Sequence, residues 1–259
     1  MKMSGSSLYS VSRLLRATGW LLFGNATQRR RVRQELARVA ASVFGDFPLS
    51  EDHKLWREDR DFLDAYSRLS PENPYSQDRK FLLREYARMA RGLPGLMAEC
   101  GCFRGASAYF MASAAPDTPL LLFDSFEGLS EPRLEDRKVE EHKRVWNRGA
   151  LAASEQVVRE TLRDFPQVRY LKGWIPKRFA EVGGEVFKIV HIDVDLYEPT
   201  LESLRFFYPR LVRGGVIVLD DYGFTLCPGA FRAVSEYMAD KPEYVLHVPT
   251  GQGVILKGA

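Results

Sequence analysis

The stretch FKIVHIDVDLYEPTLESLRFFYPRLVRGGVIVLDDYG, residues 187–223, decides the fold of this chain. Its two apolar runs, residues 189–194 and 216–219, are short and nearly continuous, which is typical of parallel strands covered on both faces. Between them, Pro199 suits the first turn of a helix, and the apolar residues that follow recur at helical spacing. The stretch therefore predicts a strand, a helix and a second strand.

Each of the two runs ends in a pair of carboxylates, Asp193 with Asp195 and Asp220 with Asp221. A right-handed crossover makes the strands parallel neighbours and puts all four acids at the carboxyl edge of the sheet, where open α/β sheets bind ligands. Because side chains alternate along a strand, Asp193 and Asp195 are expected to share a face if the strand continues that far. Asp220 and Asp221 are expected to diverge unless their strand has already broken.

Carboxylates gathered at one edge repel one another unless a cation lies between them. Oxygen ligands without a nearby His/Cys pattern favour Mg²⁺ or Ca²⁺ over zinc. The alternative interpretation is that the acids are helix caps and loop residues on a solvated edge. Four acids at adjacent strand ends favour the metal site.

Upstream, a short strand over residues 96–100 leads into a turn that contains Glu99, Gly101, Gly105 and Ser107 and precedes a helix of small residues. Glycines in a strand-to-helix turn let a ligand approach the backbone closely. The next strand, residues 120–123, ends in Asp124, which is well placed to accept hydrogen bonds from ribose hydroxyls. A nucleoside-binding site explains both features.

The remaining segments complete an α/β fold. Residues 126–149 form a long charged segment, interpreted either as a solvated loop or as an active-site lid. Helices are expected over residues 77–91, 154–165 and 229–239, a further strand over 168–171, and an antiparallel hairpin from 244–248 and 253–256. The sequence thus predicts a seven-stranded, mostly parallel, Rossmann-like sheet with a C-terminal hairpin. Residues 1–92 are predicted to be a helical N-terminal extension, and residues 93–259 the domain that holds the sheet.

Composition limits the class of protein. The chain has 259 residues, 45% of them hydrophobic, which is enough for one large core. A net charge of +3 gives no reason to expect nucleic-acid binding. The three cysteines, Cys100, Cys102 and Cys227, have no metal-finger spacing and predict a reduced, cytoplasmic protein.

No apolar run approaches the roughly 18 to 20 residues that a membrane-spanning helix needs. Residues 11–23 combine Trp, Leu and Arg and predict an amphipathic helix. Such a helix either lies on a membrane surface or partner subunit, or packs on its own domain or a dimer mate. The second interpretation is the simpler one.

Three motifs carry a resemblance to a known family: AECGCFRGAS (98–107), FDSFEGL (123–129), and HIDVDLYEPTLESL with GGVIVLDDYG (191–204 and 214–223). With the mostly parallel sheet they resemble class I S-adenosylmethionine-dependent methyltransferases. More narrowly, they resemble the macrocin O-methyltransferase (TylF) family of metal-dependent enzymes, which methylate sugar hydroxyls of macrolides and related natural products. The resemblance covers roughly residues 75–257. The chain departs from the usual first motif at Cys102, Phe103 and Ala106, which is compatible with the same backbone turn.

The resemblance implies an O-methyltransferase that uses S-adenosylmethionine and Mg²⁺, takes a small-molecule or glycosylated acceptor, and forms a homodimer. It implies cofactor contacts, from the methionine end to the adenine, at Glu99, Gly101, Gly105, Ser107, Asp124, Ser125, Phe126, Gly173 and Trp174. The Mg²⁺ ligands that it implies are Asp193, Asp220 and Asp221. Asp195 matches the position of the general base, and His191, on the same strand, and His142, in the presumed lid, are rival bases.

Two other functions remain open. A catechol-like phenol could be the acceptor, because small catechol methyltransferases use a similar metal site. A large acceptor predicts an open, partly polar cleft under residues 126–150, whereas a small phenol predicts a tight apolar one. A nucleotide-binding or scaffolding protein without turnover is the other alternative, and the intact set of acids argues against it.

Overall fold

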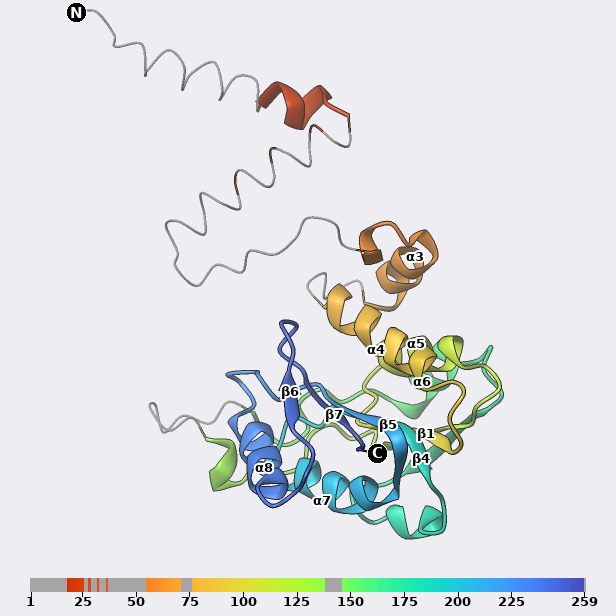
Figure 1. The fold of residues 1–259 in the computed structure, drawn as a ribbon, viewed down its shortest axis with the longest axis vertical. Helices are drawn as coiled ribbons and strands as arrows, with labels where there is room; N and C mark the ends of the chain where they lie inside the picture. The colour runs from red at the N-terminus through yellow and green to blue at the C-terminus, as the bar shows by residue number, and fades with distance from the viewer. Residues whose placement is uncertain are drawn as a thin grey trace, which may run out of the picture. The chain divides into compact units, whose positions relative to one another are not determined.

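The computed structural model describes residues 18–25, 28, 32, 36, 55–70, 76–137 and 146–258. The chain divides into two compact units, Met1–Glu58 and Asp59–Ala259, and the sheet lies in the second (Figure 1). In the first unit residues 18–23 are helical, with Leu22 and Phe23 exposed. The rest of the predicted amphipathic helix lies outside the described residues. None of the described helices combines the length and the apolar character needed to cross a membrane.

Seven strands form one sheet, in the order β3-β2-β1-β4-β5-β7-β6. Their bounds are β1 Leu96–Cys100, β2 Leu120–Asp124, β3 Val168–Lys172, β4 Phe187–Ile192, β5 Leu211–Leu219, β6 Val245–His247 and β7 Gly253–Leu256. The strands β1 to β5 pair in parallel, whereas β7 is antiparallel to both of its neighbours, β5 and β6. The predicted mostly parallel sheet with a closing hairpin is confirmed.

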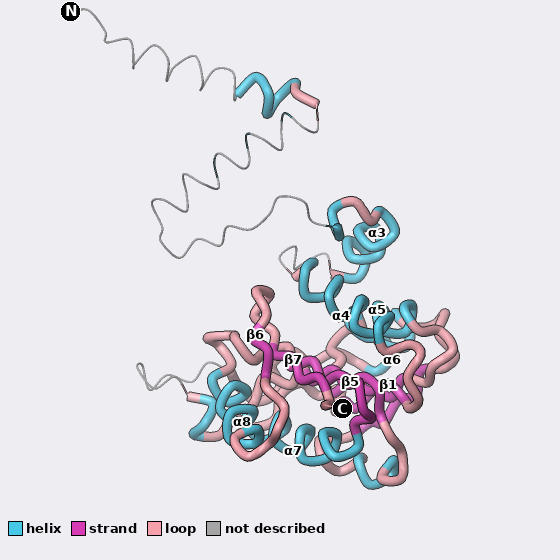
Figure 2. The backbone as a smooth tube through the Cα atoms, in the orientation of Figure 1, coloured by secondary structure: helices cyan, strands magenta, loops and turns pink. Residues whose placement is uncertain are grey.

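The α-helices flank this sheet on both sides (Figure 2). Their bounds are α3 Arg60–Leu69, α4 Gln77–Met89, α5 Ala106–Ala114, α6 Glu155–Thr161, α7 Tyr197–Phe207 and α8 Pro228–Met238. Short 3₁₀ helices are η1 Leu55–Arg57, η2 Leu134–Asp136, η3 Phe179–Val182 and η4 Tyr208–Arg210. The predicted helix from Ser154 begins as expected, because the Ser154 side chain accepts from the Val157 N–H. It ends at Thr161 rather than Phe165, because tight turns follow.

Successive strand residues enter two separate cores, because their side chains point to opposite faces of the sheet. Met97 and Leu122 pack with Leu83 of α4 on one face. Their neighbours Ala98 and Leu121 belong to the core on the other face, which α7 and α8 cover. Burial on both faces explains why the strands are almost continuously apolar in sequence.

Helix α4 is part of the unit that holds the sheet. Leu83 and Ala87 have no exposed surface, and both pack in the core with α5. Helices α3 and α4, predicted to lie in an N-terminal extension, both fall within the unit Asp59–Ala259. This packing fixes the first turn of α4 close to the carboxyl edge of the sheet.

Candidate active site

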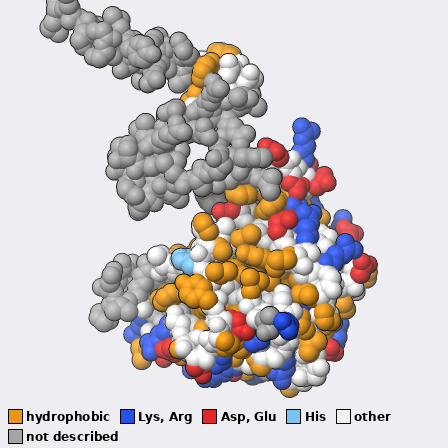
Figure 3. All heavy atoms as spheres, in the orientation of Figure 1, with side chains coloured by type: hydrophobic (Ala, Val, Ile, Leu, Met, Phe, Trp, Pro, Cys, Tyr) orange, Lys and Arg blue, Asp and Glu red, His pale blue; other side chains and the backbone are white. Residues whose placement is uncertain are grey.

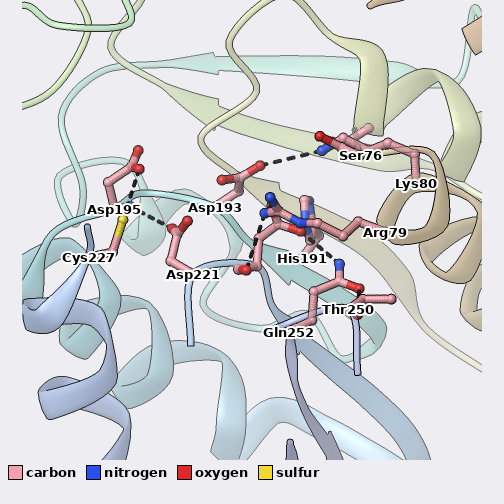
Figure 4. A network of polar contacts seen from close by, with 12 residues as sticks. Ser76, Arg79, Lys80, His191, Asp193, Asp195, Asp221, Cys227, Thr250 and Gln252 are labelled. Carbon is pink, nitrogen blue, oxygen red and sulfur yellow. Dashed lines mark hydrogen bonds and ion pairs between the residues drawn. The ribbon is translucent and has the colours of Figure 1, made fainter. Parts of the chain in front are cut away.

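The carboxyl ends of β4 and β5 lie side by side, as predicted, and bring four acids together. The Asp193 N–H donates to the carbonyl of Cys100 in β1, and the Asp220 N–H donates to the carbonyl of Ile192 in β4, both at 2.9 Å. The sheet itself therefore fixes both strand ends. The acids form two groups, in each of which the possible ligand atoms lie within 4.8 Å of one another (Figure 4).

The first group consists of His191, Asp193 and Asp220. His191 has no exposed surface. Its Nδ1 lies 2.8 Å from Glu99 Oε1, and its Nε2 lies 3.2 Å from Asp220 Oδ1. Gln252, in the turn between β6 and β7, is also fully buried and donates from Nε2 to the same Asp220 oxygen at 2.7 Å. These two contacts fix the orientation of the Asp220 carboxylate.

The second group consists of Asp195, Asp221 and Cys227. The Asp195 N–H donates to Asp221 Oδ2 at 2.9 Å, and Cys227 Sγ donates to Asp195 Oδ1 at 3.4 Å. All three residues are buried. Asp195 is thus held in place by a neighbouring acid on one side and a thiol on the other.

Asp193 and Asp195 were expected to share a face only if the strand continued as far as Asp195, and that condition is not met. Strand β4 ends at Ile192, and Asp195 has a φ of 59°, in the left-handed region. The chain therefore turns between the two residues, and their carboxylates join different groups. Asp220 and Asp221 diverge, as side-chain alternation predicts.

Two cations from the first turn of α4 also reach the acids, and neither was predicted from the sequence. Arg79 forms an ion pair with the Asp220 carboxylate and donates to the Asp220 carbonyl at 3.2 Å. Its guanidinium lies 4.3 Å from the centre of the Phe224 ring. Lys80 Nζ lies 3.7 Å from Asp193 Oδ2 and donates to Ser107 Oγ. Because α4 is an amphipathic helix with many charges, nothing in their spacing distinguished these two residues.

Burial and mutual repulsion raise the pKa of two of the acids. Burial first, and the charge of Asp193 second, raise the pKa of Asp195 to about 7. Burial, together with Asp195 and Asp193, raises the pKa of Asp221 well above its ordinary value. Burial opposes ionisation of Asp193 as well, but Lys80 and other nearby cations outweigh it and hold its pKa below the usual range. The site therefore retains protons that a divalent cation would displace.

The chemistry of the carboxylates suits a hard divalent cation, but the structure divides them between the two groups. Of the three acids that the family resemblance assigns to Mg²⁺, Asp193 and Asp220 lie in the first group and Asp221 in the second. Their carboxylate oxygens are ligands that Mg²⁺ prefers. Cys227 is a poor candidate ligand, because burial raises the pKa of its thiol and metal binding requires the thiolate.

The glycine turn after β1 packs closely against the end of β4. Gly101 has a φ of 79°, and a Cβ at this position would lie 1.9 Å from the Asp193 carbonyl oxygen. Gly105, with a φ of 85°, precedes α5 and provides no side-chain cap. Both glycines therefore allow close packing of the turn, and the turn ends in a helix N-terminus, a type of site that favours an anionic ligand.

Glu99, near the end of β1, has one carboxylate oxygen that can accept a hydrogen bond from a ligand. Its Oε1 contacts His191, whereas its Oε2 is buried and has no hydrogen-bond partner in the protein. A buried carboxylate oxygen without a partner is costly unless a ligand supplies a donor. The α-amino group of S-adenosylmethionine is such a donor, so this residue fits the methionine end of the cofactor.

Asp124, which the resemblance assigns to the ribose, is the last residue of β2. Its two carboxylate oxygens accept from the N–H groups of Cys102 and Phe126, each at 2.7 Å, and each oxygen keeps a second acceptor position. Ser125 is buried and donates to the Gly128 carbonyl at 3.2 Å. Asp124, Ser125 and Phe126 therefore form a rigid corner after β2.

Gly173 and Trp174 follow β3 and lie beside this corner. The Gly173 N–H donates to the Asp124 carbonyl at 2.8 Å, which joins the ends of β2 and β3. Trp174 is partly buried. The predicted contacts to the ribose and to the adenine are thus neighbours at one edge of the sheet.

The presumed lid is described only at its two ends, and His142 lies outside the described residues. Asp136 of η2 accepts from the Tyr197 N–H at 2.7 Å and so caps α7. Trp146 Nε1 donates to the Leu226 carbonyl at 3.1 Å. The two ends therefore attach next to Asp195 and next to Cys227.

Known proteins resemble the chain over this same region. The model of the family described as macrocin O-methyltransferase (TylF) matches residues 82–243, more than half of the chain. Demethyldecarbamoylnovobiocin O-methyltransferase of Streptomyces niveus is 32% identical over 164 residues, which are 58% of this chain and 61% of the relative. The 8-demethyl-8-(2,3-dimethoxy-alpha-L-rhamnosyl)-tetracenomycin-C 4'-O-methyltransferase of Streptomyces olivaceus is 33% identical over 152 residues, 55% of this chain and 58% of the relative. The chain thus spans about three fifths of the length of these curated relatives.

Solved structures share the fold. The O-methyltransferase NovP superposes with a TM-score of 0.60 at 23% identity, over 91% of this chain and 100% of the other. The calicheamicin methyltransferase CalS11 gives a TM-score of 0.60 at 18% identity, over 82% of this chain and 100% of the other. At these identities the likeness establishes a Rossmann-like methyltransferase fold.

Proposed function

The chain belongs to the macrocin O-methyltransferase (TylF) family, and we propose that it transfers a methyl group from S-adenosylmethionine to a sugar hydroxyl. The acceptor is a glycosylated natural product or a glycan, and Mg²⁺ is the second cofactor. The observation that carries this proposal is the four acids, in two neighbouring groups, at the ends of β4 and β5, beside a glycine turn and an unpartnered Glu99 oxygen. The tetracenomycin relative, whose name states a rhamnosyl group and a 4'-O-methyl transfer, supports a sugar hydroxyl.

The cofactor fits along the carboxyl edge of the sheet. Glu99 and Ser107, with the backbone of Gly101 and Gly105, hold the methionine end. Asp124, Ser125 and Phe126 hold the ribose, and Gly173 and Trp174 contact the adenine. The bound cofactor supplies a methyl group on a sulfonium, whose leaving group is a neutral thioether. The protein's main task is therefore to activate and orient the acceptor.

An alcohol is a poor nucleophile, because its proton is hard to remove near pH 7. Bound Mg²⁺ supplies a positive charge that lowers the pKa of an acceptor hydroxyl. Asp193, Asp220 and Asp221 hold the ion in this proposal. Asp195 takes the proton, since a pKa of about 7 leaves a large fraction of its carboxylate ionised at neutral pH.

The geometry favours Asp195 over His191 as the base. Both ring nitrogens of His191 are engaged, one by Glu99 and one by Asp220, and the ring has no exposed surface. An acceptor has no route to it without disrupting both contacts. His191 then positions the two carboxylates, and His142 remains the alternative base.

The test is an assay of S-adenosylhomocysteine release with a panel of acceptors that contains glycosylated macrolides, glycosylated aromatic compounds and a catechol. Each reaction is run with Mg²⁺ and with EDTA, and products are located by mass spectrometry. We expect methylation on the sugar that requires Mg²⁺ and is lost in Asp195→Asn. Methylation of the catechol alone would establish the phenolic alternative. Binding of the cofactor without release of S-adenosylhomocysteine with any acceptor would support the alternative without turnover.

We also propose that the enzyme acts as a cytoplasmic homodimer. All three cysteines are unpaired and buried, which is consistent with a reducing compartment. Strand β6 is an edge strand, and the exposed side chains of Tyr244 and Leu246 lie on or next to it. Figure 3 shows hydrophobic side chains gathered on the face that contains this hairpin. Light scattering on the purified protein measures the oligomeric state directly.

A further inference from the structure

Lys80 is a largely buried cation whose ammonium has more hydrogen-bond donors than the acceptors within hydrogen-bond distance of it. Its side chain is 13% exposed, and burial lowers the pKa of its ammonium. The ammonium has three donors. One of them reaches Ser107 Oγ, whereas the Asp193 carboxylate is 3.7 Å away, beyond hydrogen-bond distance. The ion pair with Asp193 offsets part of the cost of burying this charge, and an ammonium donor that does not reach Ser107 can still bind an anionic group of a ligand.

Ser107 places this ammonium at the start of α5. Ser107 is buried and lies in the first turn of the helix, which has no side-chain cap at Gly105. The N–H groups and the dipole at a helix N-terminus favour an anion. The ammonium, the hydroxyl and the helix terminus therefore converge on a position suited to a negative group.

A hydrogen-bond acceptor lies at the other end of the same glycine turn, in β1. Glu99 Oε2 is buried and has no hydrogen-bond partner in the protein. The turn from Glu99 to Ser107 is thus flanked by an unpartnered carboxylate oxygen and by a buried ammonium. A ligand that carries a positive and a negative group on the same carbon atom satisfies both, and an α-amino acid is such a ligand.

We propose that Lys80, together with Ser107, binds the α-carboxylate of the methionine part of the cofactor. This inference rests on the proposed function. It makes α4 a component of the cofactor site, although α4 precedes the sheet in sequence. The rival role for Lys80 is structural, as a counter-charge to Asp193 without contact to any ligand.

Two ligands that differ in the amino-acid part distinguish these roles. S-adenosylhomocysteine carries the α-carboxylate, whereas 5'-methylthioadenosine has the same adenosine and a thioether but no amino-acid group. Both are titrated calorimetrically, in EDTA, into the wild-type protein and Lys80→Met, which keeps the length of the side chain and removes its charge. Binding of 5'-methylthioadenosine also reports whether the variant is folded.

The matched control is Arg84→Met. Arg84 is a buried cation one turn further along α4, and it pairs with Asp59 at 2.6 Å instead of facing the glycine turn. Its loss perturbs the helix without removing a donor to the cofactor. We expect Arg84→Met to keep the wild-type ratio of the two affinities.

In Lys80→Met we expect the affinity for S-adenosylhomocysteine to fall about tenfold or more, which corresponds to ~1.4 kcal/mol. The affinity for 5'-methylthioadenosine should stay within about twofold of the wild type, a difference of less than 1 kcal/mol. An equal loss of affinity for both ligands in Lys80→Met, or no loss of affinity for either, would overturn the inference. Failure of the wild-type protein to bind S-adenosylhomocysteine would instead overturn the proposed function, and this inference with it.

Discussion

Replacement of Gly101 by alanine is expected to separate the glycine turn after β1 from the end of β4, where Asp193 lies. At a φ of 79°, an alanine costs about 1 to 2 kcal/mol more than glycine. The added Cβ would lie 1.9 Å from the Asp193 carbonyl oxygen, whereas ordinary contact begins at 3.4 Å, so the two segments must move apart by about 1.5 Å. That shift breaks the 2.9 Å bond from the Asp193 N–H to the Cys100 carbonyl, a loss of about 1 kcal/mol.

Urea unfolding monitored by circular dichroism measures the free energy of unfolding. We expect Gly101→Ala to lower it by about 2 to 3 kcal/mol relative to the wild type. The control is Gly184→Ala, because Gly184 has an ordinary φ and nothing within 4 Å of an added Cβ. That variant should stay within about 0.5 kcal/mol of the wild type. Gly101→Ala should also bind Mg²⁺ more weakly. Equal stability of the two variants, with Mg²⁺ binding intact in both, would refute this description of the turn.

Three further predictions concern the acids. Asp195→Asn should lower kcat by about 10² to 10⁴ and leave the Kd for S-adenosylhomocysteine nearly unchanged; a larger effect on the Kd than on kcat would argue against a base. Because the pKa of Asp195 is raised to about 7, more of it is protonated as pH falls from 8 to 6, so Mg²⁺ affinity should fall over that range. Calorimetry in two buffers of different ionisation enthalpy measures the protons that Mg²⁺ binding releases. An affinity for Mg²⁺ that does not change with pH would contradict the proposed coupling between Mg²⁺ binding and protonation of Asp195. Gln252→Leu removes a donor to Asp220 and should cost about 1 to 3 kcal/mol of stability, whereas an unchanged urea midpoint would mean that the contact contributes nothing.

The order of strands and helices was largely readable from the sequence. Parallel strands buried on both faces leave continuous apolar runs, and the helices between them leave an apolar stripe. The predicted ends of the helices and strands were less accurate, because the residue at which an element ends depends on the turn that follows it. The helix that begins after Ser154 stops at Thr161, where the chain turns toward β3.

The site was predictable only in part. Acids at strand ends are visible in a sequence, but their orientation is not. Asp195 turns away from Asp193 because its own backbone is left-handed. Arg79 and Gln252 join the site through packing of distant segments, and Arg79 is 141 positions from its partner Asp220. A cation on an amphipathic helix and an amide in a hairpin turn carry no local signal of that role.

The claim that one Mg²⁺ assists methyl transfer at the ends of β4 and β5 is tested most directly by calorimetric titration of Mg²⁺ into the complex with S-adenosylhomocysteine. The wild-type protein and Asp220→Asn are compared, after each is shown to bind S-adenosylhomocysteine. We predict one saturable Mg²⁺ site per chain in the wild type and its loss in Asp220→Asn, with S-adenosylhomocysteine binding retained. The absence of Mg²⁺ binding in the wild-type complex, or equal binding in the variant, would contradict the proposed metal site.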